Sequence, residues 1–260
     1  MWEEPSISGK NGSGTVFFSG CNLRCVYCQN SEINSGKVGK ELSNQEVKDL
    51  FIRINESGVH NINLVTPTHY FKRIIKILTD IKDKLDIPVV YNCSGYESVE
   101  LLKESKNVID IFLTDFKYKS SLLSERYSYC KNYFDIAIKS LETMIELKNK
   151  PIFDGELLKS GVIVRHLILP SHKDDSIDIL NELFEKFGNE KFLVSLMSQF
   201  TPTENCKSYP EINRKLTSLE YKRVKEVYDK LGFIGYVQER SSADKTYIPD
   251  FYNTGEFLTY

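Results

Sequence analysis

Segments typical of β-strands alternate with segments typical of α-helices along most of this chain. Runs of apolar, β-branched or aromatic residues predict strands at Thr15–Ser19, Asn61–Thr66, Pro88–Tyr91, Ile109–Thr114, Val162–Leu169, Phe192–Met197 and Phe233–Val237. Helical periodicity predicts helices at Ser43–Asn55, Tyr70–Lys84, Glu97–Lys103, Phe134–Leu147, Asp175–Phe187 and Ser218–Leu231. Repeated strand–helix units favour parallel strands joined by helices. The predicted fold class is therefore α/β, with a full or partial barrel or a doubly wound sheet.

Nothing in the sequence marks a boundary between domains. The 260 residues contain no repeat, low-complexity tract or Pro/Gly-rich linker, so we expect one domain over residues 1–260. The acidic start, Met1–Pro5, lacks the apolar region of a secretory signal, and no apolar run approaches the ~18 residues of a membrane span. A net charge of −2 predicts neither nucleic acid nor a membrane as partner. The expected location is the cytoplasm.

Polar residues with chemical potential follow the predicted strands, where each strand ends. They are Cys21, Thr66 to His69, Asn92 to Gly95, Asp115, Lys117, Ser198 and Gln199. In both barrels and doubly wound sheets, functional residues collect at the carboxyl ends of the strands. One face of the molecule is therefore expected to hold the site.

Three cysteines lie in one short loop, over residues 20–30. Cys21, Cys25 and Cys28 have the spacing C-x3-C-x2-C directly after the first predicted strand. Thiolates bind iron–sulfur clusters, zinc or Cu(I), and structural zinc usually takes four ligands from two separate pairs. Three thiolates on a cluster of four irons leave one iron open to a cofactor or substrate. The alternatives are free core thiols, or a zinc site completed by a histidine or by one of the scattered cysteines Cys93, Cys130 and Cys206.

This loop resembles the signature of the radical S-adenosylmethionine (SAM) superfamily, C-x3-C-x-aromatic-C, with Tyr27 at the aromatic position. Similarity to pyruvate formate-lyase activating enzymes continues in three segments: Gly14–Cys21, Asp115–Lys117 and Val164–Pro170 followed by Asp174–Ser176. Uncharacterised homologues of those enzymes resemble it most closely, through Asn61–Tyr70, Tyr91–Ser98 and Ser195–Pro202. The resemblance spans nearly the whole chain and implies a single-domain partial (βα)6 barrel.

The resemblance implies a 4Fe–4S cluster bound by Cys21, Cys25 and Cys28, with SAM chelating the fourth iron. In the family, one electron from the cluster cleaves SAM and yields a 5′-deoxyadenosyl radical, which abstracts hydrogen from a substrate. A flavodoxin- or ferredoxin-type protein is the implied reductant. Tyr27 is expected to pack near the adenine.

Further SAM-binding residues are implied by position. Thr66 and Thr68 stand where many members have Gly-Gly-Glu, although Thr68 could instead cap the following helix. Asn92 replaces an aspartate beside a cation site of the activating enzymes. Asp115 and Lys117 match residues that build this site and contact SAM, with a solvated pair as the alternative; Lys117 is also assigned a catalytic role. The expected set is completed by Ser94 and Gln199.

Arg165 and His166 interrupt an apolar strand. Alternation along a strand places them on opposite faces of the sheet, so at most one points into a barrel. Arg165 is assigned a catalytic role because a guanidinium can hold a carboxylate through two hydrogen bonds; a structural arginine is the alternative. Gln238–Ser242 could cover the rim of the site.

Three functions are compatible with the sequence. The first is an activase that abstracts hydrogen from a glycine of a glycyl radical enzyme. The second is a radical enzyme acting on a small molecule or peptide. The third, from a different class, is a zinc-stabilised, non-catalytic α/β binding module.

Overall fold

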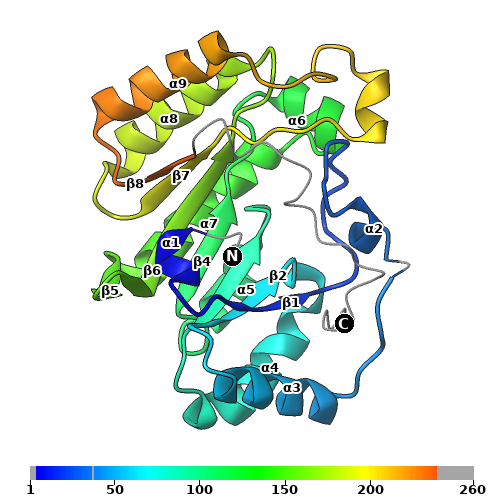
Figure 1. Cartoon of the computed structure of the whole chain (residues 1–260), viewed down its shortest axis with the longest axis vertical. Coiled ribbons are helices and arrows are strands. Elements are labelled where there is room, and N and C mark those ends of the chain that lie inside the picture. Colours follow the sequence, from blue (N-terminus) through cyan, green and yellow to red (C-terminus); the bar gives the residue numbers. More distant parts are fainter. Residues whose placement is uncertain (1–3, 37, 239–260) are drawn as a thin grey trace.

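The computed structural model describes residues 4–36 and 38–238. Their strands form one eight-stranded sheet with the order β1-β2-β3-β4-β6-β7-β8, and β5 pairs only with β6 (Figure 1). The strands are β1 Gly14–Phe17, β2 Ile62–Val65, β3 Val89–Cys93, β4 Ile111–Asp115, β5 Ile152–Asp154, β6 Leu157–Leu167, β7 Leu193–Met197 and β8 Gly235–Val237. All pairs are parallel except β5 with β6. Among the described residues, β1 and β8 are the two edges, so the sheet is an open, partial barrel, as predicted.

Helices follow most strands. The α-helices are α1 Pro5–Ser8, α2 Ser31–Asn34, α3 Asn44–Glu56, α4 Phe71–Ile81, α5 Val99–Glu104, α6 Ser121–Ser128, α7 Tyr133–Lys148, α8 Lys173–Phe187 and α9 Ser218–Leu231. Short 3-10 helices are η1 Thr68–Tyr70, η2 Lys82–Lys84 and η3 Glu204–Ser208. The longer helices α3, α4, α7, α8 and α9 lie along the outside of the sheet (Figure 1). The principal hydrophobic core fills the space between the sheet and these helices.

The inner face of the barrel has a separate core. Ile7 of α1 is 1% exposed and packs among Val90, Ile111, Leu113, Leu158, Ile163 and Leu193. Helix α1 therefore covers the concave side of the sheet, where a barrel must be filled by side chains. This one-sided arrangement of long helices is that of a barrel and not of a doubly wound sheet.

The seven predicted strands and six predicted helices are present, with shifted ends. The hairpin of β5 and β6 was not predicted; it turns at Gly155 and Glu156, and β6 begins at Leu157 instead of Val162. Helices α1, α2 and α6 were also not predicted, because each is too short or too polar to show helical periodicity. Within the described residues, no helix is both long and apolar enough for a membrane span.

Candidate active site

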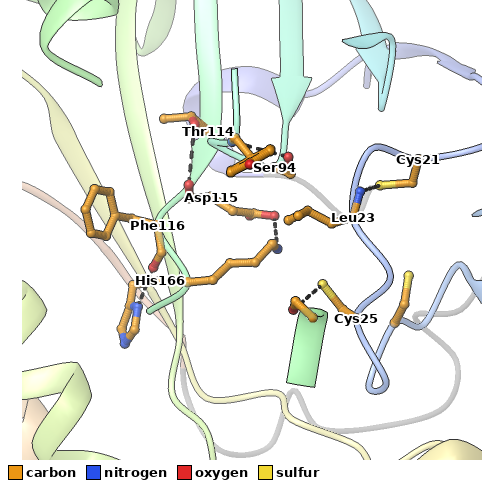
Figure 2. A network of polar contacts seen from close by, with 12 residues as sticks. Cys21, Leu23, Cys25, Ser94, Thr114, Asp115, Phe116 and His166 are labelled. Atoms are coloured by element: carbon orange, nitrogen blue, oxygen red, sulfur yellow. Dashed lines mark hydrogen bonds and ion pairs between the residues drawn. The ribbon is translucent and has the colours of Figure 1, made fainter. Parts of the chain in front are cut away.

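A cavity of about 250 Å³ opens at the carboxyl ends of the strands. Nearly every residue that the sequence assigns to the site lines it: Cys21, Cys25, Tyr27, Cys28, Thr66, Asn92, Ser94, Asp115, Lys117, Arg165 and Gln199. Thr68 does not line this cavity. Cys21, Leu23 and Cys25 lie on one side of the space and Asp115 on the other (Figure 2).

Each of the three loop thiols has its own hydrogen-bond donor. The Leu23 N–H donates to Cys21 Sγ (3.4 Å), the Ser128 hydroxyl to Cys25 Sγ (2.9 Å) and the Asn34 amide to Cys28 Sγ (2.7 Å). Burial raises the pKa of all three thiols, that of Cys28 to about 12. A bound metal is therefore needed to hold them as thiolates at neutral pH, and the donors satisfy the remaining lone pairs on sulfur. This donor set fits an iron–sulfur cluster.

A single zinc ion finds less support. Among the described residues, no three Cys, His, Asp or Glu side chains are grouped as one metal ion requires. A cluster binds each thiolate to a different iron atom, so its ligands need not converge on one point. Two of the other cysteines are buried elsewhere: Cys130 Sγ faces Asn132 (3.6 Å) and Cys206 Sγ faces Thr203 (3.6 Å). Cys93, at the end of β3, is buried and lines the same cavity as the loop thiols.

The cluster loop is fixed by elements that are remote in sequence. The N–H of Val26 donates to the Tyr127 carbonyl of α6 (2.8 Å), and the Val26 carbonyl accepts from the Thr203 hydroxyl (2.8 Å). At the start of the loop, Gly20 has a φ of 95°, and a Cβ there would lie 3.0 Å from His69 Nε2. Glycine is thus required where the chain leaves β1.

Asp115 and Lys117 form an ion pair at the end of β4. Burial acts to lower the pKa of Lys117, but the carboxylate of Asp115 outweighs it and holds that pKa well above its ordinary value. The ammonium is therefore charged at neutral pH. The hydroxyl of Tyr133, which the sequence analysis did not single out, donates to the Ser94 carbonyl (2.8 Å) and accepts from the Lys117 N–H (3.0 Å). Tyr133 thereby fixes the ends of β3 and β4 relative to each other.

A second missed residue, Asn22, joins the cluster loop to the turn after β3. Its side-chain oxygen accepts from the Ser94 hydroxyl (3.1 Å), and its side-chain amide nitrogen donates to the Tyr96 carbonyl (2.7 Å). Ser94 and Tyr96 follow Asn22 by 72 and 74 positions, so no local periodicity in the sequence could reveal these contacts.

Thr66 and Thr68 lie in different surroundings. Thr66 lines the cavity with a φ of 60°, a strained conformation for a β-branched residue. The Thr68 hydroxyl instead donates to Glu97 Oε1 (3.0 Å), and the structure shows no capping bond from it. Glu97 also accepts from the Tyr91 hydroxyl (3.1 Å), and burial raises its pKa to about 8. Glu97 is a third residue that sequence reasoning missed.

Arg165 is held by a carboxylate of the chain itself. Its Nε and one terminal nitrogen each donate to Glu4, both at 2.7 Å, and the Glu4 side chain is only 5% exposed. Burial acts to raise the pKa of Glu4, but the guanidinium outweighs it and keeps that pKa below the ordinary value. His166 points to the opposite face, as alternation predicts, where its Nδ1 faces the Phe116 carbonyl (2.7 Å; Figure 2). Burial lowers the pKa of His166 to about 4, so the ring is neutral.

A second cavity, of about 440 Å³, adjoins the first. Arg165, Met197 and Gln199 line both cavities, and the second is completed by Glu4, Pro5, Ser195, Gly235, Tyr236, Val237 and Gln238. Within the described part of the chain, the carboxamide oxygens of Gln199 and Gln238 are buried without a hydrogen-bond partner. Gln238 thus lines the second cavity; residues 239–242, which were expected with it to cover the rim of the site, lie outside the described residues.

Comparison with known proteins places this arrangement in a family. The sequence profile of the Radical SAM superfamily matches residues 15–183, so the chain belongs to this superfamily. Its cofactors are accordingly a 4Fe–4S cluster and SAM. The zinc-stabilised, non-catalytic alternative is not supported.

Two relatives are similar to this chain over most of its length. The uncharacterized protein MJ0674 of Methanocaldococcus jannaschii is 36% identical over 84% of this chain, which spans only 62% of that relative. The pyruvate formate-lyase-activating enzyme of Listeria monocytogenes is 25% identical over 72% of this chain and 75% of its own length.

Solved structures agree on the fold. Streptococcus suis SuiB bound to S-adenosylmethionine superposes with a TM-score of 0.60 at 15% identity, over 87% of this chain and 51% of SuiB. Methylornithine synthase (PylB) gives a TM-score of 0.57 at 14% identity, over 85% of this chain and 64% of PylB.

Proposed function

We propose that the chain cleaves SAM reductively at a 4Fe–4S cluster bound by Cys21, Cys25 and Cys28, and abstracts hydrogen from a substrate in the adjoining cavity. The observation that carries this proposal is the shared cavity, which brings the three thiols together with the ion pair of Asp115 and Lys117. When bound, the cluster supplies one electron to the sulfonium of SAM, which gives methionine and a 5′-deoxyadenosyl radical. A flavodoxin- or ferredoxin-type protein would supply that electron.

The residues of the chain bind and orient SAM and exclude water from the cavity. The charged ammonium of Lys117 suits the carboxylate of SAM, and Asp115 keeps it in place. Thr66, Asn92 and Ser94 offer oxygen acceptors to the ammonium and ribose hydroxyls of SAM. Tyr27 supplies an aromatic face to the same cavity for the adenine.

The second cavity supports a small molecule or short peptide as the substrate. It shares Arg165, Met197 and Gln199 with the SAM cavity, so a ligand there would lie beside the reacting centre. Arg165 would act between the two ligands, with its charge balanced by Glu4. A glycine of a glycyl radical enzyme is the second candidate, favoured by relatives named as activating enzymes.

Anaerobic reconstitution tests the cleavage step. Wild-type protein with dithionite and SAM should produce 5′-deoxyadenosine, measured by chromatography, and Cys25→Ala should not. Cys130→Ala removes a buried thiol outside the loop and should retain the activity. One zinc per chain, no iron and no 5′-deoxyadenosine would contradict the proposal.

A second assay separates the two substrate classes. Deuterated candidate substrates should transfer deuterium to 5′-deoxyadenosine if they bind in the second cavity. Gln238→Leu alters a residue that lines the second cavity but not the first, so it should weaken that transfer more than it weakens SAM cleavage without substrate. Incubation with a glycyl radical enzyme such as pyruvate formate-lyase should give a glycine-centred electron paramagnetic resonance (EPR) signal if the activase hypothesis holds.

A further inference from the structure

The end of helix α6 contacts the cluster loop at its central cysteine. Ser128, the last residue of α6, is 2% exposed and donates its hydroxyl proton to Cys25 Sγ at 2.9 Å. The neighbouring residue, Tyr127, accepts the backbone N–H of Val26 at 2.8 Å, so the position of the hydroxyl relative to the sulfur is fixed by main-chain contact. The donors to Cys21 and Cys28 come from Leu23 and Asn34, close in sequence, whereas Ser128 is 103 residues away from Cys25.

Two tyrosines extend this contact into a chain of hydroxyls. The Tyr118 hydroxyl lies 2.7 Å from Ser128 Oγ, and the Tyr27 hydroxyl lies 2.6 Å from that of Tyr118. Each hydroxyl has one proton, and a metal-bound thiolate can only accept. Because Ser128 gives its proton to Cys25, Tyr118 must donate to Ser128 and Tyr27 must donate to Tyr118. All three O–H dipoles therefore point toward the sulfur, and aligned hydrogen bonds strengthen one another in a buried site.

We propose that Ser128, supported by Tyr118 and Tyr27, sets the reduction potential of the cluster. Reduction adds negative charge to the cluster and to its sulfur ligands, so a donor to sulfur stabilises the reduced form more than the oxidised form. The hydroxyl chain thus makes the cluster easier to reduce. Ser128 is a positioning residue that acts through Cys25, and this inference rests on the proposed cluster at the three cysteines.

A redox titration of reconstituted protein, followed by EPR of the reduced cluster, tests the inference. In Ser128→Ala we expect a more negative midpoint potential of the cluster. At the wild-type midpoint potential, the ratio of reduced to oxidised cluster should then fall about three- to tenfold. For one electron, a tenfold change corresponds to a shift of about 59 mV. Tyr118→Phe keeps the serine but removes its donor, and should give a smaller shift in the same direction. Ser124→Ala is the matched control, since Ser124 is a buried serine of the same helix that donates to the Ser121 carbonyl (3.2 Å).

The outcomes separate this inference from the proposed function. If wild-type protein binds no iron–sulfur cluster, the proposed function fails. If Ser128→Ala binds iron normally and keeps the wild-type midpoint, the inference is wrong although the function stands. If Ser128→Ala cannot retain a cluster, the test passes to Tyr118→Phe. A Tyr118→Phe cluster with the same midpoint potential as the Ser124→Ala control would then overturn the inference.

Discussion

Thr66 combines a left-handed backbone with a β-branched side chain at the wall of the cavity. Such strain typically costs about 1–3 kcal/mol and is concentrated at ligand sites. Its backbone N–H is held by the Asn92 carbonyl at 2.9 Å, so the neighbouring strand β3 maintains the conformation. The sequence predicted Thr66 as a site residue but could not predict its strain, because φ is fixed by the sheet and not by the residue type.

Thr66→Gly should therefore stabilise the fold. We expect the free energy of unfolding to rise by about 1 kcal/mol, since glycine adopts positive φ freely and its own entropic cost offsets only part of the gain. Urea unfolding measures the change. Thr66→Ala removes the same hydroxyl but retains a Cβ, so a glycine variant no more stable than the alanine variant would show that Thr66 is not strained.

Glu97 predicts a pH dependence of stability. Its pKa is about 8 in the folded chain, against an ordinary value of 4.5, because burial disfavours the charged form. Between those pH values the folded protein holds a proton that the unfolded chain has lost, so stability falls as pH rises from about 4.5 to about 8. Glu97→Gln does not titrate and should lose less stability between pH 5 and pH 8, measured by urea unfolding with reductant. The control Glu100→Gln, at an exposed neighbour, should keep the wild-type slope.

At the scale of elements, a helix or strand was predicted correctly where the periodicity of its apolar residues was strong. Helix α3 was predicted from its helical periodicity, and the structure shows that a capping box begins it, with both bonds between Ser43 and Glu46. Helix α6, SLLSERYS, was missed because its serines give it no clear apolar face, yet it carries Ser128. Glu4 was likewise not assigned to the site, since its partner Arg165 is 161 residues away. Local periodicity predicts elements, whereas contacts between remote elements complete the site.

The capping box of α3 gives a prediction at this scale. Ser43→Ala leaves the Glu46 N–H at the start of the helix without its side-chain acceptor and should lower the free energy of unfolding by about 1 kcal/mol. Ser43→Asp keeps an acceptor at that position and should retain most of the stability. Thermal unfolding followed by circular dichroism compares the two, and equal losses would contradict the capping role.

At the scale of the molecule, the barrel is closed at one end and open to ligands at the other. Helix α1 fills the inner core with Ile7 and places Glu4 beside Arg165, while the cavities open where the strands end. The floor of the candidate substrate cavity is therefore built by the N-terminal segment, which precedes the first strand.

Ile7→Ala should show how much the fold depends on this segment. Removing a fully buried isoleucine typically leaves a cavity and costs about 2–5 kcal/mol. We expect a loss near the middle of that range in urea unfolding. Ile234→Ala, at a side chain that is 58% exposed, should change stability by less than about 0.5 kcal/mol. Similar losses in both variants would mean that α1 does not fill the barrel.

The double attachment of Val26 bears on how the protein matures in the cell. Its backbone N–H donates to the Tyr127 carbonyl, and its backbone carbonyl accepts from the Thr203 hydroxyl. A growing chain emerging from the ribosome cannot complete these contacts until the segment after β7 has been synthesised. Iron and sulfide delivered before that point would meet three cysteines in an unconstrained loop. Insertion of the cluster should therefore be a late, post-translational event, and a nascent chain stalled before Thr203 should fail to retain iron that the finished protein holds.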